Sequence, residues 1–268
     1  MIESISSGAS AKCARVVLFD FDGTLSLIRS GWMDVMVPMM LELLAALKTG
    51  ETEDELRAVI EEFVWRLTGK ETIYQMIALA EAIEARGGTP LAPLAYKQMY
   101  LDLLWKRIEG RVEELRQGHA SPEKYLVPGS RALLESLTAR GLELYLASGT
   151  DEAYVKEEAR LLDITRYFGD RVYGALDDYK SFSKAILIKR IIDSATFRGD
   201  EFLGFGDGYV EIEEVKNVGG VTVGVASKEP ECEAVDDWKR QRLIGAGADY
   251  IVPNFHGHQQ LLATLFGD

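Results

Sequence analysis

Two aspartates separated by one residue are the first candidates for chemistry in this sequence. Asp20 and Asp22 follow the apolar run 16–19 and precede Gly23, a pattern that favours a short buried strand ending in a turn. Side chains two positions apart on an extended chain point to the same side. Because neighbouring carboxylates repel each other, the pair requires a cation between them or a proton on one of them. An Asp-rich turn whose side chains cap backbone amides is the alternative.

Two further apolar runs also end in polar groups. The run 142–147 ends in Ser148-Gly149-Thr150, where a hydroxyl and exposed backbone amides precede a charged helix and could bind an anion. An N-cap with a turn glycine explains the same tripeptide in isolation. The run 201–205 ends in Gly206-Asp207-Gly208, which supplies a third carboxylate.

The elements that position these groups are strands separated by helices. Strand patterns are predicted at residues 16–19, 142–147, 170–174, 201–205, 221–225 and 250–252. After residue 125 the strands alternate with helices, which implies a parallel, doubly wound sheet of the α/β class. In open sheets of this kind ligands bind at the carboxyl ends of the strands, so we expect the polar groups to meet at one edge.

A helical block interrupts the sheet between its first two strands. Helices are predicted at residues 32–47, 52–69, 71–86 and 95–117. The first contains Pro38 as a kink or turn, and the second opens on the capping box Thr52-Glu53-Asp54-Glu55. We therefore predict a loose N-terminal tail at 1–14, an α/β core at 15–29 and 125–268, and a helical cap at 30–124.

The motifs together resemble those of the haloacid dehalogenase superfamily. The stretch Asp20-Phe21-Asp22-Gly23-Thr24-Leu25 matches its first motif, D-x-D-G-T-L after an apolar strand. Ser148 and Lys184 stand where the second and third motifs have a hydroxyl and a helix-start lysine, and Gly206-Asp207-Gly208 with Glu211 is similar to the fourth, G-D-G-x-x-D. The resemblance covers residues 16–255 and implies a Rossmann-like core with a helical cap inserted after the first strand.

The resemblance also implies a role for each motif residue. It makes Asp20 and Asp22 catalytic, with Asp22 also binding the metal through its backbone carbonyl. The expected phosphate ligands are Ser148, the backbone amide of Gly149 and Lys184, and the expected metal ligands are Asp20, Asp22, Asp207 and Glu211. Lys180 competes with Lys184 for the lysine role. Because Glu211 stands where the family has Asp, Glu213 and Glu214 remain alternatives to it.

Charge indicates the mechanism that such residues would support. A carboxylate that attacks a phosphate monoester brings two anions together, so we expect a hard divalent cation, Mg²⁺, between them. Asp20 would form an aspartyl-phosphate. Asp22 would start protonated, give its proton to the leaving oxygen, and then activate water.

The expected activity is therefore that of a phosphatase for a small phosphorylated metabolite, either a sugar phosphate or a phosphoglycolate-like compound. Asp22 favours release to water, because true dehalogenases of the superfamily lack an acid there. A phosphomutase shares every motif, and a catalytically silent phosphometabolite-binding protein is the alternative from another class. Arg29 and Lys70, near the start of the cap and between two of its helices, are expected to contact the substrate.

Composition narrows the classes of partner. The formal net charge is −13 and no Lys/Arg cluster stands out, which argues against a nucleic-acid surface. No apolar segment is long enough to cross a bilayer. Cys13 and Cys232 lie far apart, which argues against a disulfide framework or a zinc site and fits a reducing compartment. We expect a cytoplasmic monomer or homodimer.

Overall fold

The β-strands of this chain form one sheet. The computed structural model describes residues 2–176, 183–195 and 197–267. Within these residues the sheet has seven strands in the order β1-β7-β6-β5-β2-β3-β4, and every neighbouring pair is parallel except β1 and β7. The strands are β1 Glu3–Ser4, β2 Val16–Phe19, β3 Glu143–Asp151, β4 Val172–Ala175, β5 Phe202–Gly206, β6 Val221–Val225 and β7 Tyr250–Val252.

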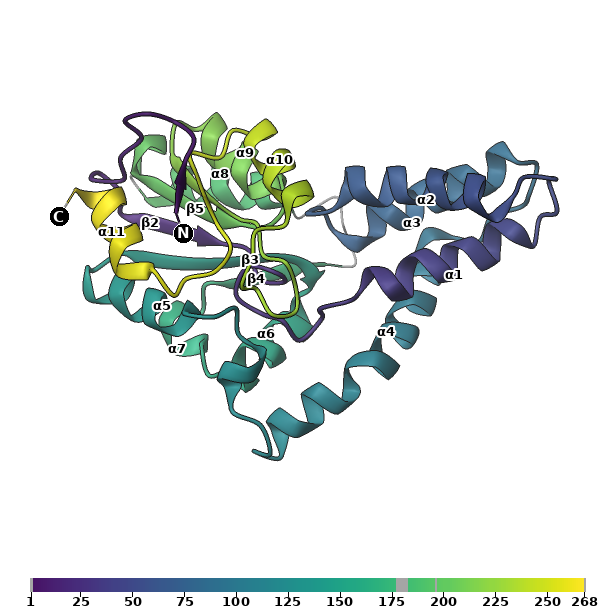
Figure 1. The fold of residues 1–268 in the computed structure, drawn as a ribbon, viewed down its shortest axis with the longest axis horizontal. Helices are drawn as coiled ribbons and strands as arrows, with labels where there is room; N and C mark the ends of the chain where they lie inside the picture. Colours follow the sequence, from purple (N-terminus) through teal and green to yellow (C-terminus); the bar gives the residue numbers. More distant parts are fainter. Residues whose placement is uncertain (1, 177–182, 196, 268) are drawn as a thin grey trace.

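Helices cover both faces of this sheet (Figure 1). They are α5 Ser130–Ala139, α6 Glu152–Leu161, α7 Thr165–Phe168, α8 Lys184–Ala195, α9 Val210–Asn217, α10 Asp237–Gly245 and α11 His258–Phe266, with short 3₁₀ turns at Pro122–Tyr125 and Gly199–Glu201. Side chains of the fully buried strand β2 alternate between the faces. Val17 and Phe19 belong to the core with α5, α6 and α11, whereas Val16 and Leu18 pack with α8 and α9. The predicted doubly wound α/β fold is confirmed.

Of the helices that lie between β2 and β3 in the described chain, the first four extend away from the sheet (Figure 1). They are α1 Met33–Ala45, α2 Glu53–Leu67, α3 Thr72–Ala85 and α4 Pro93–Arg116. The capping box of α2 is present, because Thr52 Oγ1 accepts from the Glu55 amide and the Glu55 carboxylate accepts from the Thr52 amide. α1 continues through Pro38 and does not turn there. Residues 30–124 remain our proposal for the bounds of this cap.

The connections into and out of the helical block run side by side. The Leu27 amide donates to the Tyr125 carbonyl (2.8 Å), and the Val127 amide donates to the Leu25 carbonyl (2.9 Å). An antiparallel bridge joins Ser26 to residue 126 between these bonds. The block is therefore attached to the core through two paired segments. No helix among the described residues is both long and apolar enough to cross a bilayer.

The N-terminal segment is ordered, so the prediction of a loose tail at 1–14 is wrong for the described residues 2–14. Strand β1 pairs with β7, and the Glu3 carboxylate binds the Arg240 guanidinium of α10. Further along, Ala11 is buried and the Tyr250 hydroxyl donates to the Ala9 carbonyl. The physical reason is that β7 would otherwise leave an edge of unpaired backbone groups, which even a two-residue strand can satisfy.

Candidate active site

The site lies at the carboxyl end of β2, between β3 and β5. Asp20 follows the last residue of β2, and its amide donates to the Phe205 carbonyl of β5 (2.9 Å). Below it, Phe19 stacks on Phe205 with ring centroids 4.7 Å apart. These contacts hold the backbone of Asp20 rigidly, and its side chain is almost fully buried. The four buried residues of β2 therefore position the Asp20 carboxylate at the edge of the sheet.

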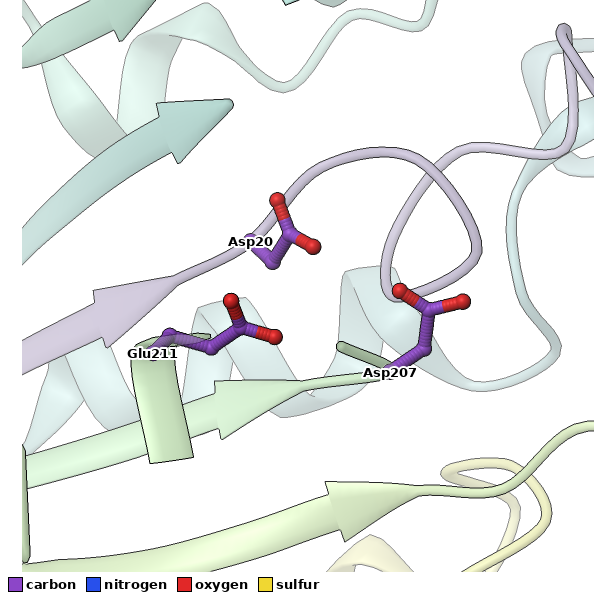
Figure 2. A group of neighbouring side chains, drawn as sticks. All are labelled: Asp20, Asp207 and Glu211. Atoms are coloured by element: carbon purple, nitrogen blue, oxygen red, sulfur yellow. The ribbon is translucent and has the colours of Figure 1, made fainter. Parts of the chain in front are cut away.

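Three carboxylates face a common space at this edge (Figure 2). Asp20, Asp207 and Glu211 each place an oxygen within 4.8 Å of the others. The Asp207 amide donates to Thr24 Oγ1 (2.9 Å), which ties the end of β5 to the turn after β2. Gly23 in that turn has φ +75°, and a Cβ there would lie 2.2 Å from Asp207 Oδ2. Only glycine lets the turn pass so close to this carboxylate.

Lys184 supplies a positive charge to two of these acids. Its Nζ lies 2.9 Å from Asp20 Oδ1 and 2.7 Å from Glu211 Oε2. Burial alone would lower the pKa of Lys184, but the charges of Asp20 and Glu211 outweigh it and raise that pKa above its ordinary value. Burial raises the pKa of Asp20 well above its ordinary value, and the Lys184 charge offsets only part of this effect. The lysine is thus a fixed cation beside the expected nucleophile.

Asp22 is held apart from the three acids by hydroxyl groups. Its Oδ2 accepts from the Thr150 hydroxyl (2.8 Å) and the Ser148 hydroxyl (3.2 Å), and the Thr150 amide donates to Ser148 Oγ (3.0 Å). Its other oxygen, Oδ1, is buried and makes no hydrogen bond within the described part of the chain. The nearest cation to Oδ1 is Arg29, whose Nε is 3.9 Å away. Hydroxyl groups therefore anchor one Asp22 oxygen, whereas the other is buried without a hydrogen-bond partner among the described residues.

Lys239 of α10 is a component of the site that the sequence pattern did not reveal. Its Nζ lies 2.8 Å from Asp207 Oδ2 and 2.7 Å from Glu229 Oε1. Burial opposes the charge of Lys239, but Asp207 and Glu229 outweigh it and raise its pKa above the ordinary value. No motif marks Lys239, because it enters the site through the packing of α10 and not through a strand end.

The acidic cluster fits a divalent metal ion. Its donors are carboxylate oxygens, which Mg²⁺ and other hard cations prefer, and two of the three acids are buried. Burial raises the pKa of Asp207 even though Lys239 opposes this, so the site gains from additional positive charge. The side chain of Asp22 lies outside the cluster, which leaves its backbone carbonyl as the atom proposed to contact a metal.

The site opens into a pocket between the core and the cap. The empty space of this pocket, including the part at its mouth that is open solvent, is about 730 Å³. The cap enters it through the turn after α2, where the Lys70 carbonyl comes so near Gly149 that a Cβ there would lie 2.7 Å from it. Arg242 of α10 donates to the Thr68 carbonyl (3.0 Å) and to the Trp65 carbonyl, and so fixes the same turn from the core side.

The pocket brings most of the predicted residues together. It is lined by Asp20, Asp22, Arg29, Lys70, Ser148, Gly149, Lys184 and Asp207. Glu211 lies beside this group, fully buried against Lys184, whereas Glu213 is exposed and Glu214 is outside the acidic cluster. Lys180, the alternative to Lys184, falls outside the described residues. The pocket is also lined by Thr150, Gln75 and Lys97, which the sequence pattern did not assign to the site, although Thr150 belongs to the tripeptide that follows the run 142–147.

Comparison with family models assigns the chain to a protein family. The model described as haloacid dehalogenase-like hydrolase matches residues 14–219. The chain belongs to the haloacid dehalogenase-like hydrolases. A comparison with curated proteins found no match.

Solved structures show the same fold as this hydrolase. A predicted phosphoglycolate phosphatase from Haemophilus somnus is 15% identical with a TM-score of 0.59, covering 93% of this chain and 98% of its own. A predicted phosphatase from Clostridium acetobutylicum is 19% identical (TM-score 0.58, 94% and 99% covered). A predicted beta-phosphoglucomutase from Thermotoga maritima is 21% identical (TM-score 0.54, 92% and 100% covered). At these identities the likeness shows the fold of the hydrolase and leaves its substrate open.

Proposed function

We propose that this hydrolase is an Mg²⁺-dependent phosphatase that cleaves a small phosphorylated metabolite through an aspartyl-phosphate at Asp20. The observation that carries the proposal is the convergence of Asp20, Lys184 and the Ser148-Gly149-Thr150 segment of β3 on one pocket beside an acidic cluster. The cation held by Asp20, Asp207 and Glu211 would neutralise phosphoryl oxygens. A cytoplasmic location is part of the same proposal, and both described cysteines are free.

Asp20 is the proposed nucleophile because it is a buried carboxylate directly at the carboxyl end of β2 and in contact with Lys184. Lys184 binds its Oδ1 at 2.9 Å, so one oxygen is oriented, and the lysine charge opposes the rise in the pKa of Asp20 that burial causes. An Asp20 oxygen attacks phosphorus, the bond to the ester oxygen breaks, and the phosphoryl group remains on Asp20. Lys184 and the amide of Gly149 then face the charge on the transferred phosphoryl group.

Asp22 is the proposed acid and base. The hydroxyls of Ser148 and Thr150 fix its Oδ2, which leaves Oδ1 as the oxygen proposed to give and accept the proton. The proton passes from Oδ1 to the leaving oxygen, and the carboxylate that remains accepts a proton from the water that hydrolyses the aspartyl-phosphate. A phosphomutase would use the same residues but return the phosphoryl group to a sugar, and a silent binding protein would perform neither step.

Phosphate release by wild-type protein and the Asp20→Asn variant tests this proposal. Wild-type protein is incubated with 4-nitrophenyl phosphate and a panel of phosphorylated metabolites, with Mg²⁺ and with excess chelator. We expect metal-dependent release that Asp20→Asn abolishes, with no loss of folded structure by circular dichroism. The matched control is Asp54→Asn, which changes an exposed acid on α2 and should keep full activity.

The possible outcomes distinguish a phosphatase from a phosphomutase and from a silent binding protein. Substantial release by Asp20→Asn would refute the nucleophile assignment. Isomerisation of a sugar phosphate without net phosphate release would identify a mutase. No turnover together with retained Mg²⁺ binding would favour a silent binding protein.

A further inference from the structure

The buried cations that line the pocket are already paired with acids of this chain. Lys184 binds Asp20 and Glu211, as described above. On the cap side, Lys97 of α4 places its Nζ 2.5 Å from Asp151 Oδ1, and only 8% of its side chain is exposed. Arg29 makes a buried ion pair of 2.7 Å with the Glu158 carboxylate of α6. Within the described residues, the inner wall of the pocket therefore offers a leaving group no cation without a carboxylate partner.

Lys70 differs from these buried cations, because its side chain is exposed and binds no carboxylate among the described residues. It lines the pocket, but its ammonium lies over the Tyr74 ring, 5.6 Å from the ring centroid. Tyr74 lines a neighbouring cavity and not this pocket. The part of Lys70 that approaches the phosphate cradle is its backbone carbonyl beside Gly149. On the inner wall, a second anionic group of a substrate would meet Asp151 and Asp22, and the cations nearest to them already have carboxylate partners.

Gln75 of α3 supplies the opposite kind of group, a neutral donor and acceptor. It lines the pocket with 4% of its surface exposed, and its side-chain amide makes no hydrogen bond to any residue that the structure describes. An amide in a pocket lining without a protein partner is available to hydrogen-bond a ligand or water. The Lys97–Asp151 pair adds further N–H donors and a free carboxylate oxygen. Hydroxyl groups, which both donate and accept, satisfy this set.

Apolar side chains complete the cap end of the pocket. Trp32, directly before α1, Met36 of α1 and Leu101 of α4 line it together with Gln75 and Lys97. A wall that mixes apolar surface with neutral donors and acceptors matches a sugar or polyol, which carries C–H surface between its hydroxyls. It matches a compact carboxylate poorly.

We propose that the substrate is the monophosphate of a sugar or polyol, whose hydroxyls bind Gln75 and the Lys97–Asp151 pair, and not a phosphate ester with a second anionic group. This inference rests on the proposed phosphatase function and narrows its substrate class. Gln75 is thereby assigned as the residue that selects hydroxylated leaving groups.

Three variants test the inference by kcat/KM on ribose 5-phosphate, 2-phosphoglycolate and 4-nitrophenyl phosphate. Wild-type protein should have a higher kcat/KM for ribose 5-phosphate than for 2-phosphoglycolate. Gln75→Leu should lower the ratio of kcat/KM for ribose 5-phosphate to kcat/KM for 4-nitrophenyl phosphate about 10- to 100-fold, as expected for one or two lost hydrogen bonds. Gln98→Leu, an exposed glutamine on α4, is the matched control and should leave both ratios unchanged. Asp151→Asn removes the carboxylate partner of Lys97. It should raise kcat/KM for 2-phosphoglycolate relative to kcat/KM for ribose 5-phosphate about tenfold.

A preference of wild-type protein for 2-phosphoglycolate would overturn the inference, as would a Gln75→Leu variant with an unchanged ratio. Calorimetric binding separates this failure from failure of the phosphatase proposal. In the Asp20→Asn background with Mg²⁺, ribose 5-phosphate should bind more tightly than 2-phosphoglycolate, and Gln75→Leu should remove that difference whether or not the wild type releases phosphate. Equal affinities in the Asp20→Asn background would refute the subsite.

Discussion

Replacing Lys239 by Met tests how the acidic cluster is stabilised. The ammonium of Lys239 lies 2.8 Å from Asp207 and 2.7 Å from Glu229, so the two carboxylates it joins lie about 5 Å apart. Two unit charges at that separation repel by about 3 kcal/mol at an effective dielectric constant of about 20. With chelator at pH 8, we therefore expect Lys239→Met to lower the free energy of unfolding by about 3 kcal/mol.

Magnesium and pH should both reduce this loss. A cation bound by Asp207 replaces part of the missing positive charge, so Mg²⁺ should stabilise the variant more than the wild type. Burial raises the pKa of Asp207, and Lys239 opposes that rise. Without Lys239 the carboxyl holds a proton more tightly in the folded state than in the unfolded state. As pH rises and Asp207 loses that proton, its carboxylate destabilises the folded state more. The loss of unfolding free energy in Lys239→Met should therefore be smaller at pH 5 than at pH 8.

Urea unfolding at both pH values, with Mg²⁺ and with chelator, measures these effects. Lys216→Met is the matched control, because Lys216 also binds a buried carboxylate, that of Asp249 at 3.0 Å, but far from the acidic cluster. Lys216→Met should lower the free energy of unfolding by the same amount with and without Mg²⁺. A loss below about 1 kcal/mol for Lys239→Met in chelator, or a loss that Mg²⁺ does not change, would refute the reasoning.

Three further substitutions address separate parts of the molecule. Asp22→Asn should lower kcat about 100-fold or more for an alkyl phosphate and less for 4-nitrophenyl phosphate, whose leaving group needs little protonation; equal losses in steady-state assays would argue against an acid at Asp22. Gly149→Ala places a methyl group against the Lys70 carbonyl, so it should raise KM and lower the free energy of unfolding by about 1 to 3 kcal/mol; an unchanged KM would show that the approach of the cap turn is unimportant. Thr52→Ala removes the cap of α2 and should lower the free energy of unfolding by about 1 kcal/mol without affecting activity, and a stability equal to wild type in urea would contradict the capping argument.

The strand ends of the site could be predicted from sequence because they depend on local pattern. A parallel sheet brings the carboxyl ends of its strands to one edge, so Asp20, Ser148 and Asp207 had to meet once their strands were recognised. The choice among Glu211, Glu213 and Glu214 needed coordinates. The first turn of α9 buries Glu211 against Lys184 and leaves Glu213 exposed, and the sequence pattern does not fix that rotation.

Residues that reach the site through tertiary packing could not be predicted in this way. Lys239 and Gln75 lie on helices whose sequences show only ordinary surface and core patterns, and their positions depend on how α10 and α3 dock. The ordered strand β1 was missed for a related reason. Its two residues carry no strand pattern, and pairing with β7 supplies the conformation.

The paired connections of the helical block have a consequence for the order of folding. Strands β2 and β3 are neighbours in the sheet although the whole block separates them in the chain, so their pairing requires the closure of a long loop. The four helices pack mainly on one another. If they assemble first, the bonds between Leu27 and Tyr125 and between Leu25 and Val127 close that loop before the sheet forms. The insertion then shortens the conformational search through which the two strands find each other.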